Sequence, residues 1–520
     1  MKRIKSLLAS LMLVAATTTA TAGGILTNTN QSIDFLRNPA RDAAIGLDGV
    51  YSNPAGVAFL PQGFHLGLNW QYAHQTRTIT TTNPDFAQGY KNNGAETKQF
   101  EGVADAPCIP SIQMAWNTGD WSLQFNFSVP GGGGKCEFND GLGSFESVVA
   151  GIRRNLQPLG AEAYNMDGYM QGRQYYFGFQ LGSAYKINDK LSVYGGLRLL
   201  YGTATYRARI SNIQVRTTDP VSGESYFKDF GSFLNSSTAR IDAGLTQVNG
   251  GIDQVNAGIA QYQNAGVQAP DALLTQLATL QAQKAQLEGT RTSLDQLQKY
   301  SQGVNLLDNQ SSVGVAPVIG IDYKLNDHFN FAAKYEMKTQ IRMKNESTVF
   351  EASEIAAVNK FRDGEEVNED QPALLTIGAQ YSPIAPVRIN LGWHHYFDKN
   401  ADWYNNTQEL LDHDTNEFLG GAEWDVNDRL TISAGGQLTR YGLTDAYMND
   451  MSFVVNSYSL GFGANYKLSN VVTLKGGFFQ TNYETKDVYY TPAATDMNQT
   501  SHNAFTRTNR VLGIGCDISL

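Results

Sequence analysis

The sequence predicts a single all-β protein, a closed transmembrane antiparallel β-barrel of about fourteen strands. Three observations support this prediction. Segments of alternating apolar and polar residues recur along the 520-residue chain, short polar turns such as Ile187-Asn188-Asp189-Lys190 join them in pairs, and the connections between pairs are long and uneven. Short turns at one end and long loops at the other are typical of membrane barrels. Closure matters because it leaves no backbone N–H or C=O group unpaired in lipid.

The chain begins with a predicted secretory signal peptide of 22 residues. Lys2, Arg3 and Lys5 precede an apolar stretch from Leu7 to Ala16, and a small-residue cleavage site ends at Ala22. This order of charge, apolar core and small residues is that of a signal peptide. We therefore expect export and cleavage near Ala22.

The charge composition argues against nucleic acid as a binding partner. Removal of the signal peptide leaves 36 of the 39 basic residues against 49 acidic ones, so the net charge falls from −10 to −13. An acidic exported chain is not expected to bind nucleic acid. The mean hydropathy of −0.32 is compatible with a membrane, because strands that face lipid on one side and water on the other average to a neutral value.

Strand-like alternation begins after residue 62, and we assign residues 62–520 to the barrel. The fourteen expected strands span 63–79, 109–117, 120–129, 173–187, 190–211, 312–325, 328–345, 371–382, 386–398, 415–426, 429–441, 454–467, 471–483 and 509–519. An even number of strands returns both chain ends to the same side of the membrane.

The segment 386–398 illustrates the pattern. Ile389, Leu391 and Trp393 alternate with polar residues, so a period of two places them together on one face. A soluble sandwich would also alternate. Two features favour the barrel. The segment 190–211 is longer than the strands of ordinary soluble sheets. Aromatic residues also precede the short turns, as in the aromatic girdle at a membrane interface, and they are Tyr185, Tyr323, Trp424 and Tyr466.

One long loop contains a predicted helical hairpin over residues 236–302. From Ile241 to Tyr262 apolar residues step alternately by four and three, which is the spacing of a coiled-coil seam. Gly266 and Pro270 interrupt the pattern, and a weaker leucine stripe follows. At 1.5 Å per residue the hairpin would stand about 30–45 Å above the barrel. It could close on itself, or it could bind a protein partner.

Three cysteines are present. Cys108 and Cys136 lie at the outer ends of neighbouring expected strands, where they could form a disulfide in an oxidising compartment or remain unpaired. Cys516 alternates onto the lipid face of the last strand, where a thiol behaves as a small apolar group.

The segment from Phe35 to Gly56 carries two Asn-Pro-Ala triplets, beginning at Asn38 and Asn53. With Asn53-Pro54-Ala55-Gly56 directly before the first strand, this segment resembles the leading segment of the FadL family of outer-membrane transporters for long-chain fatty acids and hydrocarbons. The resemblance implies that residues 23–61 form an N-terminal hatch that plugs a monomeric barrel. It also implies that hydrophobic substrate binds at the outer loops, passes the hatch and leaves sideways through a kink in the third strand.

The third expected strand departs from this pattern. It runs from Trp121 to Val129 without an internal glycine, and Pro130 and the run Gly131–Gly134 come only at its outer end. An uninterrupted strand would leave no lateral opening at mid-membrane. The final residue, Leu520, also differs from the aromatic residue typical of such barrels.

Candidate substrate ligands follow from the chemistry of a fatty acid. A carboxylate calls for a cation in a partly dry site, and the lumen-facing candidates are Arg198, Lys334, Arg342, Arg388 and Lys475. Each could instead be a solvated or ion-paired lumen charge. Beyond the third strand an amphipathic run could form an outer hydrophobic groove or could pack against the hatch; it contains Phe138, Leu142, Phe145 and Val148.

Catalytic patterns are weak, and we expect no enzyme, no cofactor and no metal site. The adjacent pair His394 and His395 points to opposite faces of a strand and cannot hold one metal ion together. The leading hypothesis is passive outer-membrane transport of hydrophobic molecules, long-chain fatty acids first. The alternatives are a general diffusion porin and a surface adhesion protein that displays the helical hairpin.

Overall fold

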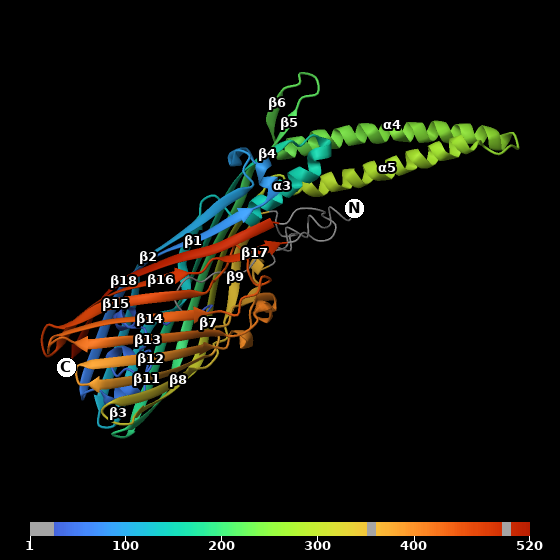
Figure 1. Ribbon diagram of the computed structural model, residues 1–520. Helices are drawn as coiled ribbons and strands as arrows, with labels where there is room; N and C mark the ends of the chain where they lie inside the picture. Colours follow the sequence, from blue (N-terminus) through green and yellow to red (C-terminus); the bar gives the residue numbers. More distant parts are fainter. Residues whose placement is uncertain (1–24, 351–359, 491–500) are drawn as a thin grey trace.

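The computed structural model describes residues 25–350, 360–490 and 501–520, and the signal peptide predicted for residues 1–22 lies outside them. The described chain forms a barrel with a helical arm that projects from one end, while the C-terminus lies at the other end (Figure 1). We call the arm end outer and the C-terminal end inner.

The barrel is closed and antiparallel with fourteen strand positions, so the predicted fold class is confirmed. Strands β1 and β18 close it, in a register that runs from His65 opposite Ser519 to Thr82 opposite His502. The strands in order around the wall are β1 (Gly63–Thr82), β2 (Thr97–Thr118), β3 (Trp121–Phe138), β4 (Ala163–Asn188), β5 (Leu191–Thr218), β7 (Val304–Lys324), β8 (Phe329–Glu336) continued by β9 (Arg342–Phe350), β11 (Leu374–Ile384), β12 (Val387–Tyr396), β13 (Thr415–Asp425), β14 (Leu430–Arg440), β15 (Ser457–Lys467), β16 (Val472–Tyr483) and β18 (Ser501–Ser519).

Several strands extend further outward than the alternation predicted. Strand β2 begins at Thr97, β3 ends at Phe138 and β18 begins at Ser501. Beyond the lipid both faces of a strand can be polar, so the alternation on which the prediction relied fades there. Three short strands add to this outer rim, and they are β6 (Ser225–Asp229) beside β5, β10 (Glu366–Asn368) beside β9 and β17 (Lys486–Tyr490) beside β18.

The wall has an apolar exterior. In β7 the side chains of Val313 and Val315 are 62% and 52% exposed, whereas Ala316 and Val318 face inward and are buried. The predicted girdle residues Tyr185, Tyr323, Trp424 and Tyr466 are all exposed on the outside, close to the short turns. This surface suits lipid, because exposed apolar area on this scale is unfavourable in water.

The short inner turns follow from their sequences. Asn188, Asn326 and Asn427 each accept hydrogen bonds from two backbone N–H groups further along the turn. Asparagine favours such turns because its side chain can replace a backbone acceptor. A recurrent Asn-Asp turn therefore sets the short end of the barrel.

The hatch lies inside the barrel and is almost entirely buried. It contains the helix α2 (Ile33–Arg37) and the 3-10 helices η1 (Leu47–Val50) and η2 (Gly56–Phe59). The N-terminus of α2 is capped by the Ser32 hydroxyl, which accepts from the Phe35 N–H. Glycines on the wall make room for this helix, since a Cβ at Gly461 would lie 2.2 Å from the Leu36 carbonyl oxygen.

The arm is an antiparallel pair of helices, α4 (Phe230–Asn264) and α5 (Asp271–Gln298). At 1.5 Å per residue the 35 residues of α4 span about 50 Å, somewhat more than predicted. Its glycines recur every seven residues and face leucines of α5, in the pairs Gly244–Leu287, Gly251–Leu280 and Gly258–Leu273. No helix in the described ranges has both the length and the hydrophobicity needed to span a membrane.

Candidate functional site: the lumen and an opening in its wall

The barrel wall is interrupted between β2 and β3. The two strands pair from Thr118 opposite Trp121 to Ile112 opposite Phe127, and again at Val103 and Gly102, but not in between. The sequence explains the interruption, because β2 contains Pro107 and Pro110 here and β3 contains Pro130. Proline has no backbone N–H to donate to a neighbouring strand.

The pairing of β3 with its other neighbour, β4, is irregular at the same level. Its register with β4 shifts between Ser128 and Gly131 and again before Gly134. Gly132 has φ +94°, and a Cβ there would lie 2.4 Å from the Gln174 carbonyl oxygen. Only glycine fits this conformation and this space without strain, so the glycine run produces the bend in β3.

The hatch replaces the missing strand partners. The Gln31 side-chain amide donates to the Val129 carbonyl at 3.1 Å and accepts from the Val129 N–H at 3.0 Å. The backbone N–H of Asn28 donates to the Pro130 carbonyl, and its side chain donates to the Gly132 carbonyl. The bend in β3 is thus held by the hatch, since buried backbone groups need partners.

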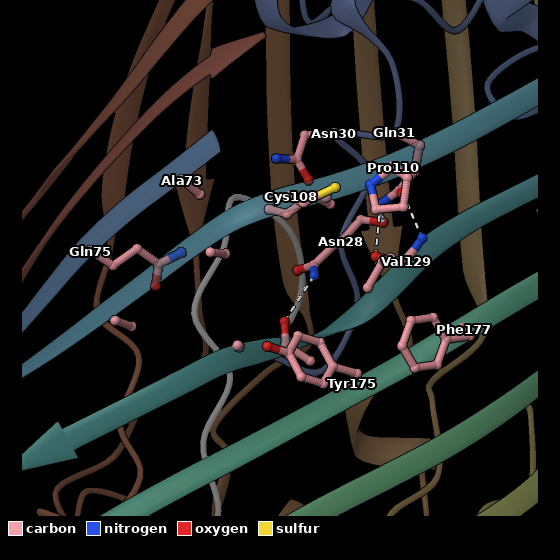
Figure 2. Close-up of a pocket in the computed structure, with 16 residues that line it drawn as sticks. Asn28, Asn30, Gln31, Ala73, Gln75, Cys108, Pro110, Val129, Tyr175 and Phe177 are labelled. Atoms are coloured by element: carbon pink, nitrogen blue, oxygen red, sulfur yellow. Dashed lines mark hydrogen bonds between the residues drawn. The ribbon is translucent and has the colours of Figure 1, made fainter. Parts of the chain in front are cut away.

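A cavity of about 170 Å³ lies at this interruption. Figure 2 shows lumen-facing Gln75 and hatch residues such as Asn28 on one side and Tyr175 and Phe177 on another. Tyr175 and Phe177 have the outward parity of β4, alternating with the buried Tyr176. The cavity is therefore lined from both faces of the wall, as a lateral opening would be.

The expectation of an uninterrupted third strand was wrong. That expectation ended the strand at Val129, whereas the strand continues to Phe138 and carries Pro130 and the glycine run in its interior. Runs of glycine and proline are typical of loops, but here the neighbouring strands and the hatch hold these residues within the wall.

The disulfide considered for Cys108 and Cys136 is not formed, and both thiols are free. Cys108 is exposed and lines the cavity, whereas Cys136 is buried among apolar side chains. The two strands are unpaired at the level of Cys108, which keeps the thiols on different sides of the wall.

Packed apolar side chains occupy much of the outer half of the lumen. We call its packed side chains the outer apolar cluster; they include Ile79, Phe86, Phe100, Cys136, Phe138, Leu142, Phe145, Tyr176, Tyr206, Met343, Phe361, Phe453 and Phe505. The predicted groove residues divide between two places. Phe138, Leu142 and Phe145 belong to this cluster, whereas Val148 lines a separate cavity.

That second cavity is an apolar groove of about 40 Å³ at the outer surface. It lies between α3 (Gly143–Leu156) and the base of the arm, and its lining includes Val148, Ile152 and Phe230. The predicted loop segment thus supplies both an outer groove and part of the lumen filling. The outer apolar cluster that holds Phe138, Leu142 and Phe145 contains no hatch residue, so packing against the hatch stays a prediction.

The inner half of the lumen is polar and fully ion-paired around the predicted cations. Arg198 binds Glu336 at 2.5 Å, and Lys334 binds the same carboxylate at 2.6 Å. Lys475 binds Asp34 of the hatch and Asp517 of β18.

The remaining two candidate cations are also neutralised. Arg388 forms ion pairs with Glu423 and Asp425, and Arg342 forms ion pairs with Asp370 and Asp402. All five predicted cations therefore hold barrel or hatch carboxylates in this structure, and none presents an uncompensated charge to a substrate.

The motif Asn53-Pro54-Ala55-Gly56 anchors the hatch to the wall. The Asn53 amide donates to Asp322 of β7 at 2.6 Å, and its oxygen accepts from the Gly56 N–H. The carbonyls of Pro54 and Ala55 accept from Gln124 of β3 and Ser192 of β5. The tight turn needs glycine at its end, because a Cβ on Gly56 would lie 2.4 Å from the Asn53 side-chain nitrogen.

Two further hatch contacts were not anticipated from the sequence. Arg41 bridges Asp48 and Glu423 at 2.8 and 2.9 Å, and buried His394 lies between Asp42 and Glu417. The charged residues of the hatch were visible in the sequence, but their partners on the barrel wall lie hundreds of residues away.

Fold and site together define a barrel with an internal hatch, an apolar outer lumen and an interrupted wall, and solved structures share this fold. A FadL homologue from Pseudomonas aeruginosa matches with a TM-score of 0.60 at 11% identity, over 96% of this chain and 100% of that chain. The P. putida toluene transporter TodX matches with a TM-score of 0.51 at 15% identity, over 91% and 94%. No family profile matches the sequence, nor does any curated protein.

Proposed function

We propose that the protein is an outer-membrane channel for the passive uptake of hydrophobic small molecules, with long-chain fatty acids as the leading candidates. Substrate would bind in the groove between α3 and the arm, enter the outer apolar cluster and leave through the opening between β2 and β3. The observation that carries the proposal is the cavity lined from both faces of the wall. A diffusion porin would not be expected to fill its lumen with apolar side chains.

A lateral exit is physically reasonable for such a cargo. Apolar surface is costly to expose to water, and an exit through the wall leads from an apolar lumen into lipid. The cavity of about 170 Å³ is similar to an apolar cavity of roughly 150 Å³ that holds one benzene molecule. An acyl chain would therefore pass a few carbons at a time, or the opening would widen.

Cys108 allows a direct test, because it is a native thiol at the opening. The protein would be produced with Cys516→Ser in cells that lack their own uptake system, and a bulky maleimide would be attached to Cys108. We expect uptake of labelled oleate and toluene to fall several-fold. The matched control Cys108→Ser cannot be alkylated there and should keep its uptake after the same treatment.

Mass spectrometry would confirm the extent of alkylation. Unchanged uptake by a fully alkylated protein would contradict an exit through this opening. Absence of uptake in the untreated protein would contradict the channel itself.

Export and location are part of the proposal. We propose cleavage after Ala22 and insertion as a monomer in the outer membrane. N-terminal sequencing of protein from the outer-membrane fraction should begin at Gly23, and recovery in the soluble periplasmic fraction would contradict the location.

A further inference from the structure

A group of basic side chains lies on the exterior of the barrel wall, near the outer ends of β3, β4 and β5. We call it the exterior basic patch, and it consists of Lys135, Arg173, Arg207 and Arg209. All four residues are exposed, and they alternate with buried residues such as Cys136, Gln174 and Ala208. They therefore point away from the lumen, because successive side chains of a strand point to opposite faces.

Strand register brings the four basic residues together. Lys135 of β3 lies directly opposite Arg173 of β4. Two residues further out on β4, Gln171 lies directly opposite Arg207 of β5, and Arg209 follows on the same face of β5. Residues directly opposite one another on neighbouring strands have Cβ atoms about 5 Å apart, and diagonal neighbours are within reach of long side chains. The four cations therefore form one continuous surface.

The patch carries an excess of positive charge. The carboxylate on the same rungs of these three strands is that of Glu137, which forms an ion pair with Lys135 at 2.7 Å. No described residue forms an ion pair with Arg173, Arg207 or Arg209. Four basic residues against one carboxylate leave an excess of three positive charges, in a chain whose net charge is −10. Like charges at this spacing repel each other, so an anionic ligand would relieve the repulsion.

The patch lies just beyond outward-facing aromatic residues of β4. Tyr185 belongs to the inner girdle, and Tyr175, which lines the wall opening (Figure 2), lies ten residues further out. At about 3.3 Å per residue and a tilt of roughly 40°, this distance corresponds to a height of about 25 Å, which is that of the apolar band in membrane barrels. Arg173 lies two residues beyond Tyr175. The patch therefore begins about 5 Å above the apolar band, at the level of the lipid headgroups.

We propose that the exterior basic patch binds the phosphate groups of an outer-leaflet glycolipid whose acyl chains cover the apolar band beneath it. Arginine suits phosphate because its planar guanidinium donates two parallel hydrogen bonds. The combination of cations above and apolar side chains below matches a phosphorylated lipid and not a soluble phosphate compound. The lipid stands beside the wall opening, because Tyr175 and Phe177 line that opening. This inference rests on the proposed outer-membrane location, and it adds a lipid site outside the lumen.

The test compares bisphosphorylated lipid A with the same lipid after removal of both phosphates. Native mass spectrometry would measure their binding to the purified full-length wild type and to the triple variant Arg173→Gln, Arg207→Gln, Arg209→Gln. We expect the triple variant to bind lipid A about tenfold more weakly or worse, as for the loss of charge-assisted hydrogen bonds. The dephosphorylated lipid should bind both proteins equally weakly. The matched control Arg440→Gln removes an exterior cation of β14 that is paired with Glu484, and it should bind lipid A like the wild type.

The triple variant should fold, because the substitutions remove no ion pair between described residues and one hydrogen bond, from Arg173 to the Thr205 hydroxyl at 2.8 Å. The heat-modifiable mobility of the barrel on gels would confirm it. Equal affinity of the wild type and the triple variant for lipid A would overturn the proposal. So would displacement of bound lipid A by inorganic phosphate at millimolar concentration, which would identify a site for soluble phosphate.

Uptake of labelled oleate, measured separately, distinguishes this proposal from the channel function. A wild type that binds lipid A through the patch but takes up no oleate would support the lipid site and contradict the channel. A wild type that takes up oleate but binds lipid A no better than the triple variant would contradict the lipid site alone.

Discussion

The inner and outer halves of the lumen differ in the interactions that hold their buried side chains. In the inner half the hatch and the wall pair their buried charges, as in Arg41 with Asp48 and Glu423. In the outer half apolar side chains pack together, and two buried groups of like charge, Arg77 and Arg507, lie opposite each other on β1 and β18. Ion pairs therefore hold the inner half together, whereas apolar packing fills much of the outer half. Under the proposed function, the inner half is the plug and the outer half is the substrate path.

The largest expected effect concerns the plug. Arg41→Ala leaves the buried Asp48 carboxylate without its partner and weakens the attachment of the hatch to Glu423. Removing one member of a buried ion pair typically costs about 3–5 kcal/mol. We expect the variant to conduct ions in planar lipid bilayers, where the wild type stays closed. The control Arg291→Ala, in an exposed pair on the arm, should stay closed, and equal conductance of both variants would exclude a sealing role for Arg41.

A second prediction compares the same substitution in the two halves. Arg198→Gln removes one of the two cations that pair with Glu336, the other being Lys334, and should destabilise the barrel by up to about 3–5 kcal/mol. Arg77→Gln removes a repulsion with Arg507 and should stabilise it by up to about 1 kcal/mol. Unfolding in urea within lipid vesicles would measure both. The same sign for both variants would show that the halves do not differ in this way.

The opening provides a third and smaller effect. Gly132→Ala places a Cβ in a left-handed conformation close to the Gln174 carbonyl, a strain of about 1–3 kcal/mol. We expect the bend in β3 to shift and hydrophobic uptake to fall a few-fold, with the barrel still inserted. Gly195→Ala is the matched control, because an added Cβ there meets nothing within 4 Å. Full uptake by the Gly132 variant would indicate that the bend does not set the rate.

The smallest effect is expected for the arm. Replacing residues 247–284 with a short Gly-Ser linker keeps the base of the arm, where Phe233 and Leu294 pack together. Uptake of oleate should remain within about twofold of the wild type. Loss of binding to cells or surfaces with intact uptake would identify the arm as an adhesive device, and loss of uptake would place the whole arm on the substrate path.

The sequence identified the elements whose signals are local. Period-two alternation predicted the fourteen strand positions. Asn-Asp sequences indicated the end of the barrel that has short turns, and the coiled-coil spacing from Ile241 to Tyr262 predicted the helical arm. The motif at Asn53 identified the anchor of the hatch. These patterns are visible because each depends on residues a few positions apart.

The candidate site was predicted less well, for identifiable reasons. The five proposed cations were chosen by strand parity, which says which face a side chain occupies but not which carboxylate lies opposite it. Arg507 fell outside the expected last strand, which was taken to begin at residue 509, although β18 begins at Ser501. The glycine run in β3 was assigned to a loop because local composition cannot show that the hatch will hold it in the wall.

The sequence by itself determined an alternating chain that must close into a barrel, with a hatch before it and an arm within it. Tertiary structure alone decided which charges meet. Arg41 reaches Glu423 across 382 positions, and Arg77 faces Arg507 only because the first and last strands close the wall in one register. The physical reason is that closure fixes pairings between distant residues, whereas the periodicity that reveals each strand carries no information about its neighbour.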